Sequence, residues 1–185
     1  VHLGVDPADY PYKSSAEKER VVGFISRMNY ENGLDILVEA FALLKKKRGF
    51  EDVKLMLTGG YTGDDKKFLK GIHRTIRRKN LTGEVIFQES FEGEDRLEFF
   101  GKVSVVSVPV RLGEAFGIYL TESMASGIPV IQPSLGAFPE IVEISGAGAV
   151  YEENTPEGLC KALEDHLNFR NNYERLSNKA RASIE

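Results

Sequence analysis

The chain has 185 residues, of which 42% are hydrophobic and 28% are charged, a mixture typical of one globular domain with a substantial core. Its formal net charge of −4 argues against a generally basic nucleic-acid-binding protein. The single Cys160 excludes an internal disulfide or a cysteine-built metal site. Such sparse cysteine is simplest to explain in a reducing compartment, so we expect a cytoplasmic protein.

Six short apolar runs, rich in β-branched residues, alternate with helical patterns along the chain. Near-continuous apolarity is typical of strands that are buried on both faces of a sheet. The alternation predicts an α/β fold with a doubly wound parallel sheet of about six strands, of Rossmann-like type. The predicted strands cover residues 21–26, 53–57, 84–87, 103–108, 129–132 and 148–151.

Helical periodicity fills the intervals between these strands. A helix is also expected after Phe116, a short one near Pro139, and one from about Pro156 to Phe169, with Thr155 as its N-cap and a proline in the first turn. The two clearest apolar stripes are Leu34, Leu37, Val38, Phe41 and Leu44, and then Phe68, Leu69, Ile72 and Ile76.

The ends of the chain differ in composition from its middle. Residues 1–18 are rich in proline, tyrosine and charge, which predicts a linker and lead-in. Residues 19–170 are expected to form the domain, and residues 171–185 a last helix that is cut short. Because the chain opens with VHLGVDPADY and no methionine, we expect it to be an excised fragment.

The loops that follow the strands are the informative places in such a sheet, because ligands bind outside the carboxyl ends of parallel strands. Three of these loops contain glycine, which lets the backbone approach a ligand closely. Any single glycine is more often a simple turn former, so these positions carry little weight alone. They are Gly59 and Gly60, Gly113 and Gly117, and Gly136.

The fourth loop carries two carboxylates, Glu114 and Glu122, around the start of a helix. The free N–H groups and the dipole of that helix start favour an anion such as a phosphate. Two carboxylates would repel a phosphate, so we expect them to accept hydrogen bonds from neutral hydroxyls on either side, one set from a sugar and one from a ribose. The alternative is that Glu114 caps the helix and Glu122 is a solvated residue.

The stretch PVRLGEAFGIYLTESMASGIPVIQPSLGAFPEIV, residues 109–142, resembles the core signature of retaining glycosyltransferases of the GT-B fold. In that pattern two glutamates stand seven residues apart and precede small residues, a Gly-x-Pro-Val element and a glycine-rich turn that ends in glutamate. GFISRMNYENGLDILVEAF resembles the first strand, arginine, loop and helix of the family. VHLGVDP is similar to its interdomain linker. The resemblance spans nearly the whole chain and implies the C-terminal, donor-binding half of a GT-B enzyme.

The resemblance implies a role for each matching residue. Glu114 would contact hydroxyls of the donor sugar and Glu122 those of the ribose. Arg27 would pair with the diphosphate and stabilise the leaving nucleotide, which is electrostatic catalysis and needs no metal. Backbone groups would complete the site, with Phe116, Gly117 and Ile118 on sugar and phosphate oxygens and Ser90 and Phe91 beside the base.

Several positions depart from the family pattern. Asn32 stands where a lysine is common, and Glu89 stands where the third-strand loop usually has glycine. Gly136 is followed by Ala137 instead of a second glycine. The run from Pro109 to the first glutamate is one residue longer than the commonest form. These differences leave the diphosphate affinity and the nucleotide base, UDP, GDP or ADP, undecided.

We therefore expect a nucleotide-sugar-binding domain of a hexosyltransferase, with the acceptor bound by an N-terminal domain that is absent here and the fragment inactive alone. The alternatives are a nucleotide-sugar epimerase or phosphorylase on the same fold, or a degenerate non-catalytic module. No cofactor and no nucleic acid are expected. The basic segment 64–79 is best explained as a solvated helix face, with contact to a membrane surface or to nucleic acid as the less favoured alternative.

Overall fold

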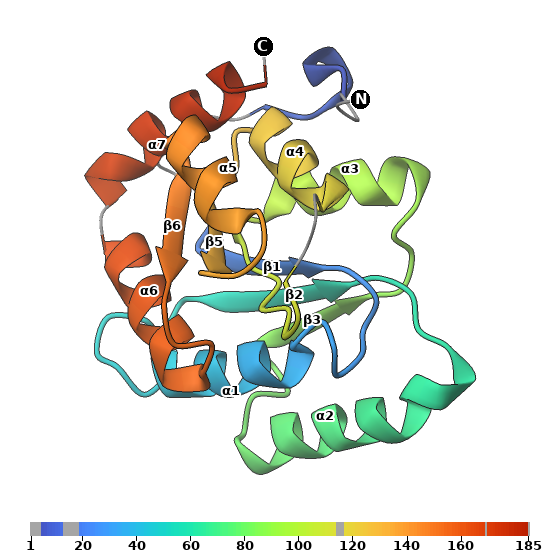
Figure 1. Cartoon of the computed structure of the whole chain (residues 1–185). Helices are drawn as coiled ribbons and strands as arrows, with labels where there is room; N and C mark the ends of the chain where they lie inside the picture. The colour runs from blue at the N-terminus through green and yellow to red at the C-terminus, as the bar shows by residue number, and fades with distance from the viewer. Residues whose placement is uncertain (1–4, 13–18, 114–116, 169, 185) are drawn as a thin grey trace.

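The computed structural model describes residues 5–12, 19–113, 117–168 and 170–184. Its six strands form one wholly parallel sheet in the order β3-β2-β1-β4-β5-β6, which confirms the predicted fold class (Figure 1). The strands are β1 (Val21–Ile25), β2 (Lys54–Thr58), β3 (Val85–Gln88), β4 (Val105–Val106), β5 (Val130–Pro133) and β6 (Gly148–Tyr151).

Helices cover both faces of the sheet, as Figure 1 shows for α1 and α2 on one face and α3 and α4 on the other. α6 packs on α1, and α7 packs on α4. The bounds of the helices are α1 (Leu34–Leu44), α2 (Lys66–Arg78), α3 (Gly93–Lys102), α4 (Ile118–Ala125), α5 (Phe138–Ser145), α6 (Pro156–Asn168) and α7 (Arg170–Ala182), with 3-10 turns η1 (Pro7–Asp9) and η2 (Gly63–Asp65).

The predicted strand over residues 103–108 is the one that the structure shortens most, to two residues in β4. Its pairing with β1 does extend a little further, because the Ser107 N–H donates to the Gly23 carbonyl at 3.0 Å. The next amide, of Val108, is taken by the Gln132 side chain at 3.1 Å. Pro109 follows and has no N–H, so the regular ladder ends there.

α3 is the one helix that the sequence patterns did not locate. Half of the residues in its sequence, GEDRLEFFGK, are charged, and the helix buries only Phe99 and Phe100. A single buried pair does not produce the repeated apolar stripe on which helix prediction depends. By contrast, the predicted cap of α6 is confirmed, since the Thr155 hydroxyl accepts a hydrogen bond from the Gly158 N–H at 3.1 Å.

The described part of the lead-in, residues 5–12, lies against the domain (Figure 1). The Tyr12 hydroxyl donates to the Asn178 side chain on α7. Arg181, also on α7, donates to the carbonyl of Pro7 at 2.7 Å and to that of Ala125 at the end of α4. These contacts hold the lead-in beside α4 and α7.

Candidate functional site

The order of the strands predicts a ligand-binding crevice between β1 and β4, where the strand order reverses. From β1 the chain moves outward to β2 and β3, and from β4 it moves in the opposite direction to β5 and β6. The loops after β1 and β4 therefore separate at this point, and ligands of doubly wound sheets bind in the resulting crevice outside the carboxyl ends of the strands. The two loops are residues 26–33 and 107–117.

The backbones of these loops touch each other and the loop after β2. The Arg111 N–H donates to the Glu31 carbonyl at 2.9 Å. Gly33 has φ +70°, and a Cβ there would lie 1.9 Å from the Pro109 carbonyl oxygen. Gly59 has φ +133°, and a Cβ there would lie 1.8 Å from the Ser26 carbonyl oxygen. Only glycine permits these approaches, so at these two positions glycine shapes the floor of the crevice.

α4 begins at the mouth of this crevice. Its N-cap Gly117 is left-handed with φ 64°, and no side chain in the described part of the chain caps the helix. The N–H groups at the very start of a helix have no carbonyl partner within the helix itself, and they lie at the positive end of the helix dipole, which favours an anion. Ile118 is 46% exposed at this start. The predicted site residues Glu114 and Phe116 lie outside the described residues.

Arg27 follows β1 directly, and its side chain is 49% exposed. Its Nε donates to Asp65 Oδ2 at 3.0 Å, and its Nη2 donates to Asp65 Oδ1 at 3.3 Å and to the Thr62 hydroxyl at 3.0 Å. The hydrogen bond with Asp65 raises the pKa of the guanidinium, which stays charged. No bond from Nη1 is seen among the described residues, so one edge of Arg27 is fixed and the other can still donate.

Asn32 is held within its own loop. Its side-chain amide donates to the Ser26 hydroxyl at 3.0 Å and to the Arg27 carbonyl at 2.9 Å. The amide that stands in place of the family's lysine thus braces the loop that carries Arg27. Arg111, a nearby cation, is engaged as well: it pairs with Asp35 at 2.8 Å and stacks 3.6 Å above the ring of Tyr30.

Glu122 lies one turn inside α4 and is only 4% exposed, so it is not a solvated residue. Its Oε1 accepts from Arg96 Nε at 2.6 Å and from the Tyr10 hydroxyl at 3.0 Å, and its Oε2 accepts from Arg96 Nη2. The hydrogen bond to Glu122 raises the pKa of the Arg96 guanidinium. Burial, and then the charge of Glu122, raise the pKa of Tyr10 to about 12.

Sequence reasoning missed both Arg96 and Tyr10 as members of this cluster. Arg96 lies on the helix that was not located, and Tyr10 lies in a segment predicted to be a linker. Their separations from Glu122 along the chain are 26 and 112 residues, so no local spacing connects them. The only available indication was that Arg96 is a single cation in a strongly acidic stretch.

The loop after β3 contains Ser90 and Phe91. The Ser90 carbonyl accepts from the Thr58 hydroxyl at 3.2 Å and from the Gln88 side chain at 2.8 Å. The Phe91 carbonyl accepts from Arg96 Nη1 at 3.3 Å. Both carbonyls are thus already used to hold the loop at the ends of β2 and α3. Their predicted contact with a nucleotide base stays a prediction.

Groups that could hold a metal ion are absent from the described residues, in which no cluster of three or more histidine, cysteine or acidic side chains occurs. Within the same part of the chain, none of the helices is both long enough and apolar enough to cross a bilayer.

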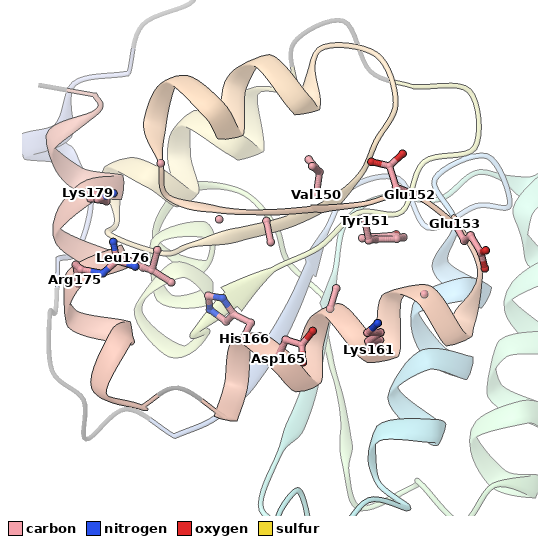
Figure 2. A pocket seen from close by; sticks show the side chains of 15 residues that line it. Val150, Tyr151, Glu152, Glu153, Lys161, Asp165, His166, Arg175, Leu176 and Lys179 are labelled. Atoms are coloured by element: carbon pink, nitrogen blue, oxygen red, sulfur yellow. The ribbon is translucent and has the colours of Figure 1, made fainter.

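A separate hollow of about 720 Å³ lies at the other edge of the sheet, between β6, α6 and α7 (Figure 2). His166 of α6 lies in this hollow near Arg175 and Leu176 of α7. Burial lowers the pKa of His166 from 6.5 to about 4. The hollow is remote from the β1–β4 crevice along the sheet order, and the histidine bears on stability rather than on the candidate site.

His166 should make the fold sensitive to mild acid. Between pH 6.5 and pH 4 the unfolded chain binds a proton that the folded chain excludes, so the free energy of unfolding falls as the pH is lowered through this window. We expect a loss of about 2 kcal/mol from this residue between pH 7 and pH 5. Urea titrations at several pH values should show that the free energy of unfolding depends less on pH in His166→Gln than in the parent. His73→Gln, at an exposed position on α2, is the control. If the unfolding free energies of the parent and the His166 variant change equally with pH, His166 is not the source of the acid sensitivity.

The fold is the Rossmann-like half of a GT-B architecture, with the loops after β1 and β4 at its ligand-binding edge. The family model for glycosyl transferases group 1 matches residues 9–183. The chain belongs to that family.

Individual relatives agree with this assignment. The chain is 25% identical to an uncharacterised glycosyltransferase of Methanocaldococcus jannaschii, with all of this chain and 48% of the relative aligned. It is 27% identical to a D-inositol 3-phosphate glycosyltransferase of Mycolicibacterium vanbaalenii, over 90% of this chain and 40% of the relative. The chain thus spans half or less of the length of these curated relatives.

Solved structures show the same fold. The C-terminal domain of a glycosyl transferase group 1 family protein from Francisella tularensis superposes with a TM-score of 0.85 at 19% identity, and 98% of this chain covers 96% of that domain. Anabaena HepE, solved in complex with UDP and glucose, gives a TM-score of 0.84 at 21% identity, with 98% of this chain and 50% of that chain covered.

Proposed function

We propose that this domain binds the nucleotide-sugar donor of a retaining hexosyl transfer. The observation that carries the proposal is the start of α4 beside the loops after β1 and β4, where no side chain of the described residues caps the helix, with Glu122 one turn further along the helix. Helix N-termini bind phosphate groups through their free amides and their dipole. The diphosphate would lie on the amides of Gly117 and Ile118.

In the proposed reaction the bond between the anomeric carbon and the diphosphate breaks, and the nucleotide leaves with the electron pair. The acceptor hydroxyl forms the new bond to that carbon and passes its proton to an oxygen of the departing diphosphate. Negative charge therefore grows on the diphosphate, where the start of α4 and the free edge of Arg27 would stabilise it. Asp65 holds Arg27 in place beforehand, which reduces the cost of ordering a long side chain at binding.

The two glutamates would accept hydrogen bonds from hydroxyl groups on either side of the diphosphate. Glu122 would accept from the ribose, and Glu114 from the donor sugar. A buried carboxylate suits this task because it accepts hydrogen bonds strongly and rejects a ligand that lacks the hydroxyl. The solved complexes of Anabaena HepE with UDP, with UDP and glucose and with UDP-glucose support a nucleotide-sugar ligand, and UDP is the first nucleotide to test.

The acceptor would be bound outside residues 1–185, since the chain spans half or less of the curated relatives compared above. The domain alone is then expected to bind the donor without turnover. A cytoplasmic location of the whole protein is part of this proposal. Contact of the protein with a membrane surface is a less favoured addition to it. It is supported by the exposed cations of α2, which form no ion pairs among the described residues: Lys66, Lys67, Lys70, Arg74 and Arg77.

The proposal predicts nucleotide binding without a divalent metal. Calorimetric titration of UDP, GDP and ADP in EDTA should show that at least one nucleoside diphosphate binds, because cationic side chains and helix amides supply the positive charge. Binding that requires added Mg²⁺ or Mn²⁺ would show that this charge is insufficient.

The same titration separates the competing functions. A degenerate, non-catalytic module whose site is lost would bind none of the three nucleotides. An epimerase or phosphorylase on this fold would bind nucleotide or sugar ligands too, so product analysis with the full-length protein is needed to distinguish it from a transferase.

A further inference from the structure

The carboxylate of Glu122 cannot be reached by a ligand in the arrangement that the structure shows. The residue is 4% exposed. Arg96 lies against it from α3, and Tyr10 lies against it from the lead-in segment. A ribose that is to contact this carboxylate must therefore displace one of the two.

The hydrogen-bonding capacity of Glu122 gives the same result. A carboxylate has about four acceptor positions, two on each oxygen. On Oε1 both positions are filled, one by Arg96 Nε at 2.6 Å and one by the Tyr10 hydroxyl at 3.0 Å. On Oε2 one position is filled, by Arg96 Nη2. A ribose cis-diol has two O–H donors and needs one free position on each oxygen, but only Oε2 has one.

Tyr10 is the group that is easier to remove. Arg96 is charged, binds both oxygens of Glu122 and also donates to the Phe91 carbonyl at 3.3 Å. Tyr10 donates a single hydrogen bond from an uncharged hydroxyl, so its removal breaks one bond and separates no ion pair, whereas removal of Arg96 would break three bonds and leave the buried carboxylate without its cation. If Tyr10 leaves, one acceptor position opens on Oε1 while Arg96 keeps the carboxylate oriented. The two free positions then match the two hydroxyls of a cis-diol.

We infer that the Tyr10 hydroxyl occupies the position of a ribose hydroxyl on Glu122, and that a nucleotide binds by displacing it. This inference rests on the proposed donor function. Tyr10 then sets the nucleotide affinity by competition, and Arg96 positions the carboxylate in both states. Displacement also loosens the lead-in, because Tyr10 joins that segment to α3 and α4 through Glu122 and through its ring contact with Phe100 at 6.1 Å.

The test compares two tyrosines of the same segment. Tyr10→Phe keeps the ring and removes the competing donor, so it should bind a nucleoside diphosphate about three- to tenfold more tightly than the parent. Tyr12→Phe is the matched control, because the Tyr12 hydroxyl donates to Asn178 and not to Glu122. Its affinity should equal that of the parent. The corresponding 2′,3′-dideoxynucleotide has no hydroxyl to compete, so it should bind equally to the parent and to Tyr10→Phe.

A second measurement follows the segment itself. Amide hydrogen exchange at Asp9 and Tyr10, whose N–H groups bond to the Asp6 and Pro7 carbonyls, should become faster when nucleotide is added. Unchanged or weaker nucleotide binding by Tyr10→Phe, with the parent binding normally, would overturn the inference and leave the donor site standing. If neither protein binds any nucleoside diphosphate, the proposed function fails and this inference fails with it.

Discussion

Replacing Glu122 with alanine is expected to abolish nucleotide binding and to lower the free energy of unfolding by about 2–3 kcal/mol. The substitution leaves Arg96 without its partner, and breaking a fully buried ion pair costs about 3–5 kcal/mol. The lower figure reflects the partial exposure of Arg96, whose side chain is 25% accessible against 5% for Glu122. Urea denaturation and calorimetric titration of the same variant measure the two effects.

A double variant separates the structural role of this pair from its role in binding. Glu122→Met with Arg96→Met removes both charges, and such apolar replacements of buried pairs often restore stability. We expect the unfolding free energy to recover while nucleotide binding stays lost. Glu98→Ala, which breaks only the exposed pair with Lys102 on α3, serves as the control and should change stability by less than about 1 kcal/mol. Nucleotide affinity that survives in the double variant would remove Glu122 from the proposed site.

Gly33→Ala should be among the most damaging single-methyl substitutions in the chain. The new Cβ would meet the Pro109 carbonyl oxygen at 1.9 Å, on a residue whose φ of +70° already disfavours any side chain. We expect a loss of about 3 kcal/mol or more in unfolding free energy, because backbone strain and a backbone clash add together. The loops after β1 and β4 would separate, so nucleotide affinity should fall by at least about tenfold, or about 1.4 kcal/mol.

The matched control for this prediction is Gly71→Ala. Gly71 lies inside α2 with nothing within 4 Å of the position of a new Cβ, and its φ is in the ordinary helical range. Alanine there should raise stability by about 0.5–1 kcal/mol through its better helix propensity. Thermal denaturation of both variants gives the comparison. A Gly33→Ala protein as stable as the parent would mean that the two loops can part without cost.

The strands were predictable because the apolar composition of each one indicates by itself that the strand is buried. Runs such as VVGFI and VKLML are apolar almost throughout, which occurs where both faces of a parallel sheet are covered. Strand pairing then follows from general rules of connection. The end of β4 and the presence of α3 were not predicted, because both depend on residues elsewhere in the chain. The Gln132 side chain ends β4, and burial of only Phe99 and Phe100 anchors α3.

The sequence by itself determined the α/β fold and the family, since these follow from short-range patterns and from motifs of contiguous residues. It also predicts the loop that would bind a phosphate, and this stays a prediction. The sequence could not predict which hydrogen-bond partners the side chains near that loop would have. Only the tertiary structure shows that Tyr10 and Arg96 donate hydrogen bonds to Glu122. It also shows that Arg27 pairs with Asp65 and that the Asn32 side chain donates to a carbonyl of its own loop. Each of these contacts depends on the direction of a side chain and on which elements the fold places side by side. Hydrogen-bonding groups that are far apart in the chain leave no periodic trace in its sequence, because their pairing is decided when the sheet and its covering helices assemble.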